Sequence, residues 1–224
     1  MVNINLESVD VSTFELSDIS KLKNLLLKEG ELQILPFEQL KEFSQNEISQ
    51  FCVQEGFYII PTQELIHFLQ SEIGDTDLSK VMEIGAGHGA ISRELKIRAV
   101  DNYMQEIPEV RAMYEAMQQT IVPYGKHVEK MDGNEAIRKY KPSIVIGAYC
   151  THKYNPKEHF RGGNQYGFNE KLILERVEKY IHIGNQSVHN KKPIMKYKHR
   201  EIKEEWILSR SQNIGQNVIY IWEK

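Results

Sequence analysis

The chain has 224 residues and a mass of 26.1 kDa, with 41% hydrophobic residues, 26% charged residues and a net charge of −3. This composition can bury a core, which excludes a chain that is disordered throughout. The net charge argues against a protein that coats nucleic acid over its whole surface. No apolar run approaches the roughly 18 residues of a membrane span, and no secretory leader is visible. Two cysteines, Cys52 and Cys150, exclude a disulfide scaffold, so the sequence predicts a cytoplasmic globular protein.

Residues 1–75 are predicted to form a helical N-terminal extension, which also acts as a lid. Ser17 and Asp18 can cap a first helix, Pro36 opens a second and Thr62 caps a third. These helices cannot bury their apolar faces by themselves. We therefore expect the extension to pack on the domain that follows it.

Residues 76–224 alternate short apolar strands with helical patterns, which is typical of a parallel α/β sheet. The strands are expected at residues 80–84, 97–100, 127–131, 143–148 and 180–183. Two more strand-like runs, 206–209 and 218–222, are separated by a turn sequence and predict a C-terminal antiparallel hairpin.

The strongest local signal is the run VMEIGAGHGA, from Val81 to Ala90. An apolar strand ends there in glycines that allow a sharp turn into a helix. Without β-carbons, the turn lets a ligand lie against the main chain at the helix N-terminus. Asp101 ends the next predicted strand, where a carboxylate in a nucleotide-binding fold accepts ribose hydroxyls. On the glycines alone, a tightly packed turn without a ligand is the alternative.

The pattern E-x-G-x-G-x-G from Glu83 to Gly89 resembles motif I of the class I S-adenosylmethionine-dependent methyltransferases. The resemblance covers residues 57–224 at the level of motifs and element order. It implies a Rossmann-like class I methyltransferase fold, with a seven-stranded, mostly parallel sheet and a C-terminal antiparallel hairpin. A dinucleotide-binding pattern would place its last glycine at Ala90, so an NAD-dependent Rossmann oxidoreductase is the weaker alternative.

The resemblance also implies which residues would bind S-adenosyl-L-methionine. Asp101 would take the ribose hydroxyls and Asp132 the adenine amino group. The full set comes from the glycine turn and from the ends of the second, third and fourth strands: Glu83, Gly85, Ala86, Gly87, Gly89, Asp101, Asn102, Asp132, Gly133 and Ala148. The fourth strand ends in Gly-Ala-Tyr-Cys, which departs from the Asn/Asp-Pro-Pro-Tyr of many amino-methylating enzymes.

Residues 149–168 follow the fourth strand without clear periodicity, and a loop of this length in a compact domain is usually functional. Ligands of open parallel sheets bind beyond the carboxyl ends of the strands, so we expect the methyl acceptor here. Tyr149 and His152 are the candidate catalytic residues, as a base or by positioning the acceptor. A solvated loop histidine is an equally good interpretation of His152.

The acceptor itself is not encoded in a motif. We expect a small-molecule acceptor. The basic stretch 191–200 keeps a nucleic-acid acceptor open, although the glutamates that follow favour an ordinary solvated loop. A cofactor-binding protein without catalysis is a further alternative, because the amino-methylating motif is missing. The histidines lack the spacing of a zinc site, so no metal site is predicted.

Overall fold

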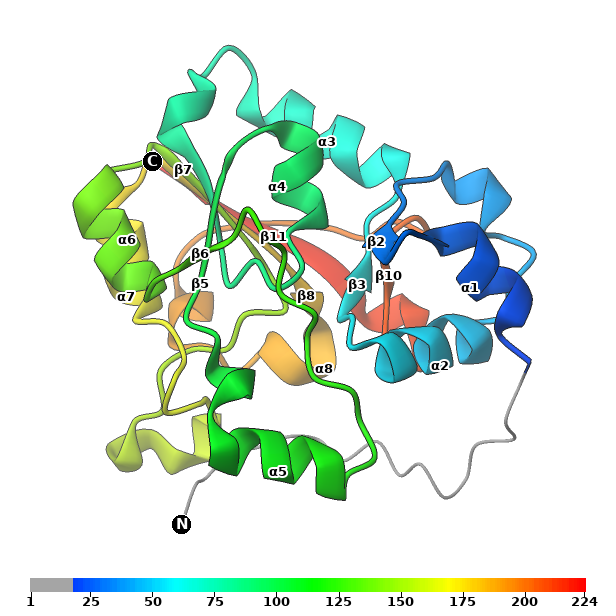
Figure 1. Cartoon of the computed structure of the whole chain (residues 1–224). Coiled ribbons are helices and arrows are strands. Elements are labelled where there is room, and N and C mark those ends of the chain that lie inside the picture. The colour runs from blue at the N-terminus through cyan, green and yellow to red at the C-terminus, as the bar shows by residue number, and fades with distance from the viewer. Residues whose placement is uncertain (1–17) are drawn as a thin grey trace.

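The computed structural model describes residues 18–224, so Ser17 and the rest of residues 1–17 lie outside the described part of the chain. A seven-stranded sheet of order β6-β5-β4-β7-β8-β11-β9 forms the centre of the molecule (Figure 1). Its strands are β4 (Val81–Ile84), β5 (Arg98–Asp101), β6 (Glu129–Lys130), β7 (Ile144–Ala148), β8 (Lys179–Asn185), β9 (Arg200–Ile202) and β11 (Asn217–Glu223). The strands from β6 to β8 run parallel, and β11 is antiparallel to both of its neighbours. The predicted seven-stranded, mostly parallel sheet is therefore confirmed.

The predicted partner of the last strand is wrong. Residues 206–209 do not pair with β11, because Leu208 and Ser209 form a short strand, β10 (Leu208–Ser209), that pairs with β3 (Ile59–Ile60). The antiparallel partners of β11 are β8 and β9. An apolar run indicates that a strand is buried but not which strand it pairs with. The sequence pattern therefore predicts β10 as the hairpin partner of β11, whereas the structure has β9 in that place.

Helices cover both faces of the sheet. On one face lie α3 (Gln63–Ile73) and α4 (Ala90–Leu95), and on the other lie α6 (Gly133–Tyr140) and α7 (Glu170–Arg176). The alternation of side chains along each strand separates the two cores: Val81 packs with α3 and α4, and Met82 packs with α6 and α7. Figure 1 shows α6 and α7 together, on the far side of the molecule from α1 and α2.

The N-terminal extension is less helical than predicted. It contains α1 (Ser20–Leu26), a hairpin of β1 (Leu27–Lys28) and β2 (Glu31–Leu32), and α2 (Gln45–Glu55). Pro36 opens only a single 3-10 turn, η2 (Phe37–Gln39), instead of a helix. The cause is local, because Ser44 and Glu47 form a reciprocal capping box that starts α2 afresh.

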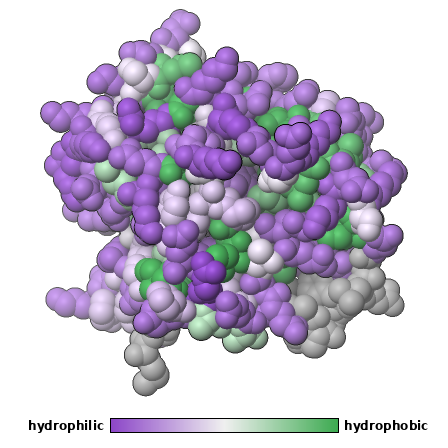
Figure 2. Space-filling view, in the orientation of Figure 1, coloured by the Kyte–Doolittle hydropathy of each residue, from purple (hydrophilic) through white to green (hydrophobic). Residues whose placement is uncertain are grey.

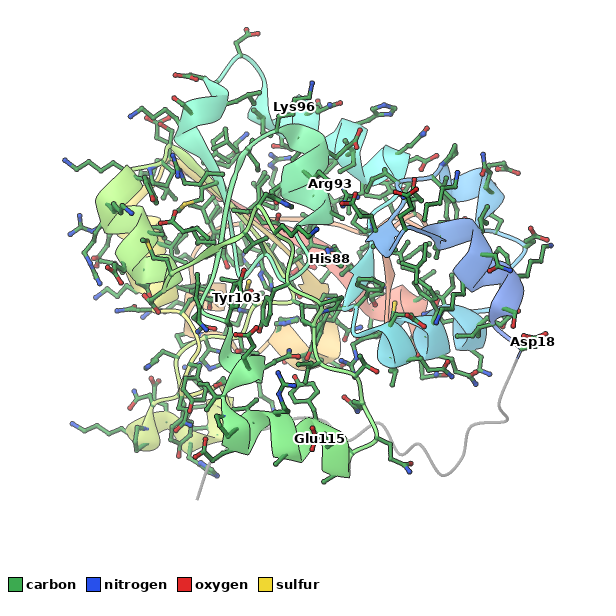
Figure 3. The ribbon with its side chains drawn as sticks, in the orientation of Figure 1. Asp18, His88, Arg93, Lys96, Tyr103 and Glu115 are labelled. Atoms are coloured by element: carbon green, nitrogen blue, oxygen red, sulfur yellow. The ribbon has the colours of Figure 1, made fainter. Side chains whose placement is uncertain are left out.

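The extension packs on the sheet domain, as expected. Its apolar side chains form one buried cluster with Ala90 of α4 and Leu208 of β10. Arg93, labelled on α4 in Figure 3, donates a hydrogen bond to the Leu32 carbonyl oxygen and lies 3.3 Å from the Glu31 carboxylate. Contacts that α4 and β10 make with the extension therefore hold it against the domain.

The remaining helical segments connect the strands. They are η3 (Leu78–Lys80), η4 (Met104–Glu106), α5 (Pro108–Ala116), η5 (Pro156–Arg161), α8 (Gln186–His189), η6 (Pro193–Lys196) and η7 (Ile214–Gln216). The face of the molecule in Figure 2 is largely hydrophilic, with scattered apolar areas. Within residues 18–224, no helix combines the length and the apolarity that a membrane crossing requires.

Candidate functional site

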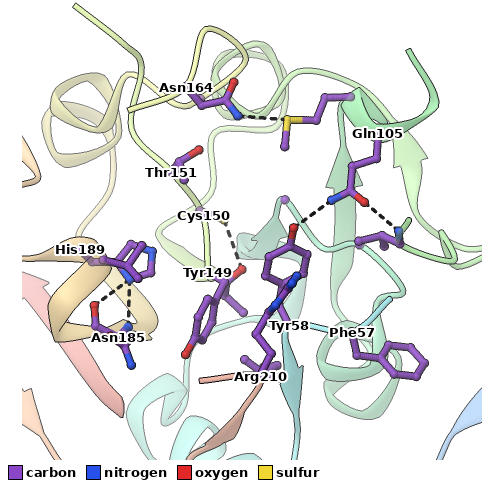
Figure 4. A pocket seen from close by; sticks show the side chains of 18 of the residues that line it. Phe57, Tyr58, Gln105, Tyr149, Cys150, Thr151, Asn164, Asn185, His189 and Arg210 are labelled. Atoms are coloured by element: carbon purple, nitrogen blue, oxygen red, sulfur yellow. Dashed lines mark hydrogen bonds between the residues drawn. The ribbon is translucent and has the colours of Figure 1, made fainter. Parts of the chain in front are cut away.

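A cavity of about 1090 Å³ lies beyond the carboxyl ends of β4, β5, β7 and β8, where a parallel sheet is expected to bind its ligand (Figure 4). Its wall combines the glycine turn, the loop after β7, α8, the segment before α3 and the connection between β10 and β11. Many of the residues singled out from the sequence line it: Glu83, Gly85, Ala86, Gly87, Asp101, Asn102, Ala148, Tyr149 and His152. The cavity thus joins the predicted cofactor residues to the predicted acceptor residues.

Asp132 and Gly133 were predicted to contact the cofactor but do not line the cavity. Asp132 is the N-cap of α6, and its Oδ1 accepts hydrogen bonds from the backbone N–H groups of Asn134 and Glu135, at 2.9 and 3.0 Å. A Cβ on Gly133 would lie 2.3 Å from Cε1 of Phe168. These residues start a helix and admit an aromatic ring.

The glycines of the turn are needed for backbone shape and for close packing. Gly85 and Gly87 have φ of 58° and 55°, a region that side chains rarely adopt. A Cβ on Gly85 would lie 2.7 Å from Sγ of Cys150. Gly89 does not line the cavity, and its missing Cβ makes room for the ring of His127. The alternative of a packing role is therefore correct for Gly89, whereas Gly85 and Gly87 also expose backbone to the cavity.

Asp101 connects the turn to β5. Its Oδ2 accepts a hydrogen bond from the Gly87 N–H at 3.0 Å, and its Oδ1 accepts one from the Tyr103 N–H at 2.9 Å. Burial raises the pKa of this carboxyl group, although the backbone hydrogen bonds oppose the shift. Each oxygen keeps acceptor capacity for a hydroxyl group in the cavity. Tyr103, labelled in Figure 3, comes shortly after the end of β5.

Asn102 has a structural role that the sequence did not indicate. Its side-chain amide donates a hydrogen bond to the Tyr166 carbonyl oxygen at 3.0 Å, and its Oδ1 accepts one from the Met104 N–H at 3.0 Å. Both ends of the side chain are thus engaged within the protein. Asn102 tethers the loop after β7 to the end of β5, and so fixes one wall of the cavity.

Glu83 is a buried carboxyl group at the base of the turn. It is 2% exposed, and its Oε2 accepts a hydrogen bond from the Ser92 N–H at 2.9 Å. Burial, with a further contribution from the Asp101 charge, raises the pKa of Glu83 to about 7. No lysine or arginine of residues 18–224 lies within ion-pair distance of it. The site therefore offers a buried carboxyl group that lines the cavity without a cationic partner among the described residues.

Tyr149 and His152 begin the loop after β7. Tyr149 has φ of 55° and is held by its N–H, which donates to the Ile183 carbonyl oxygen at 2.8 Å. Its hydroxyl donates to Oδ1 of Asn217 at 3.2 Å, and burial raises its pKa. Burial, with a further contribution from the Lys192 charge, lowers the pKa of His152 to about 4, so the imidazole is neutral at pH 7. Tyr149 thus presents a fixed ring to the cavity, and His152 is a neutral side chain only 7% exposed.

A buried ion pair fixes this loop from behind. The Lys192 ammonium group lies 2.6 Å from Oε1 of Glu170 and donates to the Cys150 carbonyl oxygen at 2.8 Å. Lys192 belongs to the basic stretch that was interpreted as a solvated loop, and for this residue the interpretation is wrong. Burial raises the pKa of the Cys150 thiol, which donates to the Ile84 carbonyl oxygen at 3.3 Å. Cys150 is therefore a buried structural thiol.

Several lining residues were missed from the sequence. Asn185 and His189 follow the carboxyl end of β8, and the rule that ligands bind at strand ends would have pointed to them. Arg210 lies in the connection between β10 and β11, where no motif marks it. Its guanidinium lies over the ring of Tyr58, 4.6 Å from the centroid, and donates to Oε1 of Gln119 at 2.8 Å (Figure 4).

No metal centre is found in the part of the chain that the structure describes. Within residues 18–224, no group of three or more His, Cys, Asp or Glu side chains is arranged to hold a metal ion.

Comparison with known proteins finds likeness in structure only. No protein-family model and no curated protein sequence matches the chain. Among solved structures, an rRNA methylase from Streptococcus thermophilus is 14% identical, over 72% of this chain and 95% of its own, with a TM-score of 0.40. The ribosomal protein L11 methylase from Lactobacillus delbrueckii subsp. bulgaricus is 10% identical, over 72% of this chain and 78% of its own, with a TM-score of 0.34. A mutant of Spodoptera frugiperda DNMT2 is 8% identical, over 63% of this chain and 48% of its own, with a TM-score of 0.32.

These likenesses concern the overall fold, and the strand arrangement is the stronger observation. Five parallel strands are followed by β11, which inserts antiparallel between β8 and β9, and the glycine turn leaves the central strand β4. Helices cover both faces, and the cavity lies at the carboxyl ends of the strands. The chain has a Rossmann-like α/β fold with a seven-stranded, mostly parallel sheet.

Proposed function

We propose that the protein is a methyltransferase that binds S-adenosyl-L-methionine at the glycine-turn end of the cavity and the methyl acceptor at the end formed by the loop after β7. The observation that carries the proposal is the pair of carboxyl groups, Glu83 and Asp101, which line that first end. They suit a ligand with both positive charge and ribose hydroxyls.

The residues present fit this cofactor. Glu83 is buried without a cationic partner, so an ammonium or sulfonium group nearby would relieve the cost of ionising it. Asp101 keeps acceptor capacity beside the exposed backbone of Gly85 and Gly87. The bound cofactor would supply an electrophilic methyl group on a sulfonium. The protein's own task is then to orient the acceptor and to hold its proton.

Tyr149 and His152 keep separate roles in the proposal. The hydroxyl of Tyr149 is bound to Asn217, so its ring would position the acceptor and would not act as a base. His152 is neutral at pH 7 and can accept a hydrogen bond, but a pKa of about 4 makes it a weak base, so it remains the candidate base only for a proton that becomes acidic as the methyl group is transferred.

Calorimetry with S-adenosylmethionine and S-adenosylhomocysteine tests the cofactor. Replacing Asp101 with Asn should weaken binding by about 1–3 kcal/mol, because a charged acceptor of hydrogen bonds is lost. Asp132→Asn is the matched control, since Asp132 lies outside the cavity and asparagine also caps helices. Wild-type protein that binds NAD but neither methionine derivative would overturn the proposal, as would equal losses in the two variants.

A further inference from the structure

The charges that line the cavity are divided between its two ends. Glu83 and Asp101 are the only carboxyl groups that line it within the described residues, and both lie at the glycine-turn end. Arg161 and Lys191 line the part formed by the loop after β7 and the segment after α8, whereas Arg210 lies over Tyr58 in another part of the wall. A cation is thus favoured at one end and an anion at the other. Since the proposed cofactor is cationic, the cationic end is left for the acceptor.

The positive charge continues outside the cavity as a basic rim, which we define as Lys153, Lys157, Arg161, Lys191 and Lys196. The rim joins two segments that are far apart in sequence. Arg161 of η5 donates a hydrogen bond to the Lys191 carbonyl oxygen at 3.4 Å. The Glu158 carboxylate, which pairs with Arg161 at 2.9 Å, also lies within electrostatic range of Lys196 on η6.

The rim is an exception in an acidic chain. Residues 149–168 carry a net charge of +2 and residues 186–200 carry +5, whereas the whole chain carries −3 and the rest of it therefore carries −10. Three cations of these segments are already paired, because Lys192 pairs with Glu170, Arg200 with Glu72 and Arg161 with Glu158. Arg161 and Lys191 line the cavity, and the other rim lysines lie on the same two segments. A polyanion would thus be attracted to these segments and repelled by the acidic rest of the chain.

An exposed aromatic ring accompanies these cations. The side chain of Phe160 is 70% exposed and also lines the cavity, next to the guanidinium of Arg161, which lies 5.0 Å from its ring centroid. A phenylalanine in water gains nothing for stability, but a ring between basic residues is a stacking platform for an unpaired base. A base can enter such a cavity only when it is not stacked in a duplex.

We infer that the acceptor is a single strand of nucleic acid, with its phosphates on the basic rim, one base stacked on Phe160 and the reacting base inside the cavity. The inference rests on the proposed methyltransferase function and names its acceptor class. It replaces the small-molecule acceptor expected from the sequence.

Fluorescence anisotropy with labelled single-stranded RNA and DNA of about 20 nucleotides tests the inference. Binding should weaken steeply between about 50 and 200 mM salt. The triple variant Lys157→Gln, Lys191→Gln, Lys196→Gln should bind about tenfold more weakly and reduce the slope of log affinity against log salt by about 2, because three phosphate contacts are lost. Phe160→Ala should weaken binding about tenfold while leaving the salt slope unchanged.

The matched control replaces three exposed lysines away from the rim: Lys28→Gln, Lys80→Gln and Lys224→Gln. Lys80 and Lys224 lie beside the amino ends of the parallel strands, at the end of the sheet opposite the cavity. Lys28 lies in the N-terminal extension. This variant makes the same change in net charge and should bind as the wild type does. Equal losses in both triple variants, or an oligonucleotide that binds no more tightly than a mononucleotide, would overturn the inference.

Calorimetry on the same proteins separates this inference from the proposed function. The rim variant should bind S-adenosylmethionine with the affinity of the wild type, since no rim residue lies at the glycine turn. Oligonucleotide binding without cofactor binding would support the rim and refute the methyltransferase. Cofactor binding without oligonucleotide binding would do the reverse. A preference for RNA or DNA in the two arms identifies the nucleic acid.

Discussion

Glu83 shows how burial can raise the pKa of a carboxyl group that lines a cavity, so that it keeps a proton near neutral pH. In the free protein its pKa is raised to about 7, so at neutral pH the carboxyl group is partly protonated. A cation in the cavity favours the ionised form and lowers that pKa. Ligand binding and proton release are then one linked event.

We predict that S-adenosylmethionine binds more tightly as the pH rises from about 6 to 8, with no further gain above this range, because the ionised form of Glu83 is the one that binds. Titration calorimetry in buffers of different ionisation enthalpy should detect protons released on binding below pH 7. Glu83→Gln should abolish the release and weaken binding by about 1–3 kcal/mol. Glu94→Gln, an exposed change on α4, serves as the control, and proton release that survives Glu83→Gln would contradict the prediction.

Asp101 and Asp132 show what the sequence can and cannot tell about single residues. Asp101 ends β5, and Asp132 follows β6 as the N-cap of α6, so the motif treats them alike. The structure separates them by their hydrogen-bond donors: Asp101 accepts from the glycine turn, and Asp132 accepts from its own helix. Helix capping is a local alternative that any aspartate at a helix start can adopt, and only the packing of Phe168 on Gly133 excludes Asp132 from the cavity wall.

At the scale of helices and strands, a buried ion pair holds the start of the connection after β7 in place. Lys192, in the turn before η6, pairs with Glu170 at the start of α7 and also binds the Cys150 carbonyl oxygen. The Tyr180 hydroxyl on β8 donates to the same Glu170 oxygen at 3.2 Å. The pair of Lys192 and Glu170 therefore links the end of β7 to α7 and to β8.

We predict that Lys192→Met lowers the free energy of unfolding by about 3–5 kcal/mol, because the Glu170 carboxylate is left buried without a partner. Urea denaturation measures the loss. Lys191→Met, a change in the adjacent exposed side chain, should alter stability by less than about 0.5 kcal/mol. The double variant Lys192→Met, Glu170→Gln should recover part of the loss, and a single variant as stable as the wild type would show that the pair contributes nothing.

The elements that sequence patterns predicted well are those whose pattern is complete within a few residues. The five parallel strands and the glycine turn fall in this class, because apolar runs and glycines act locally. The pairing of Leu208 with Ile60 depends on residues that are distant in sequence, so the segment was assigned to the wrong partner. The helix predicted after Pro36 failed for a related reason, since the cap at Ser44 competes with it and no rule ranks the two.

At the scale of the whole molecule, three buried histidines make the fold sensitive to acid. Burial lowers the pKa of His182 and His189 well below the usual range, and lowers that of His152 to about 4. Their Nε2 atoms have no hydrogen-bond partner among the described residues. The folded state thus keeps the rings neutral at a pH where the unfolded chain takes up protons.

Stability should therefore be constant with respect to these groups above about pH 6.5 and fall below it, by up to about 1.4 kcal/mol per pH unit for each histidine. Glu83 acts in the opposite direction between its unfolded pKa and about 7, so the Glu83→Gln variant should show the steeper loss in acid. Denaturation at a series of pH values measures both. His182→Gln should reduce the slope by one proton, whereas His67→Gln, an exposed change, should not.

The loop after β7 is closed at its own base. The Phe168 N–H donates to the Thr151 carbonyl oxygen at 3.0 Å, and the Lys153 N–H donates to the Phe168 carbonyl oxygen at 2.7 Å. Phe168 in turn packs against Gly85 and Gly133, so the base of the loop is part of the core. The tip beyond it, with η5 and Phe160, is joined to the rest of the chain by the hydrogen bond from Arg161 to the Lys191 carbonyl oxygen. Doubling the length of such a tip costs only about 0.6 kcal/mol of closure entropy, so the scaffold can carry a longer or different tip while the glycine-turn end of the cavity stays the same.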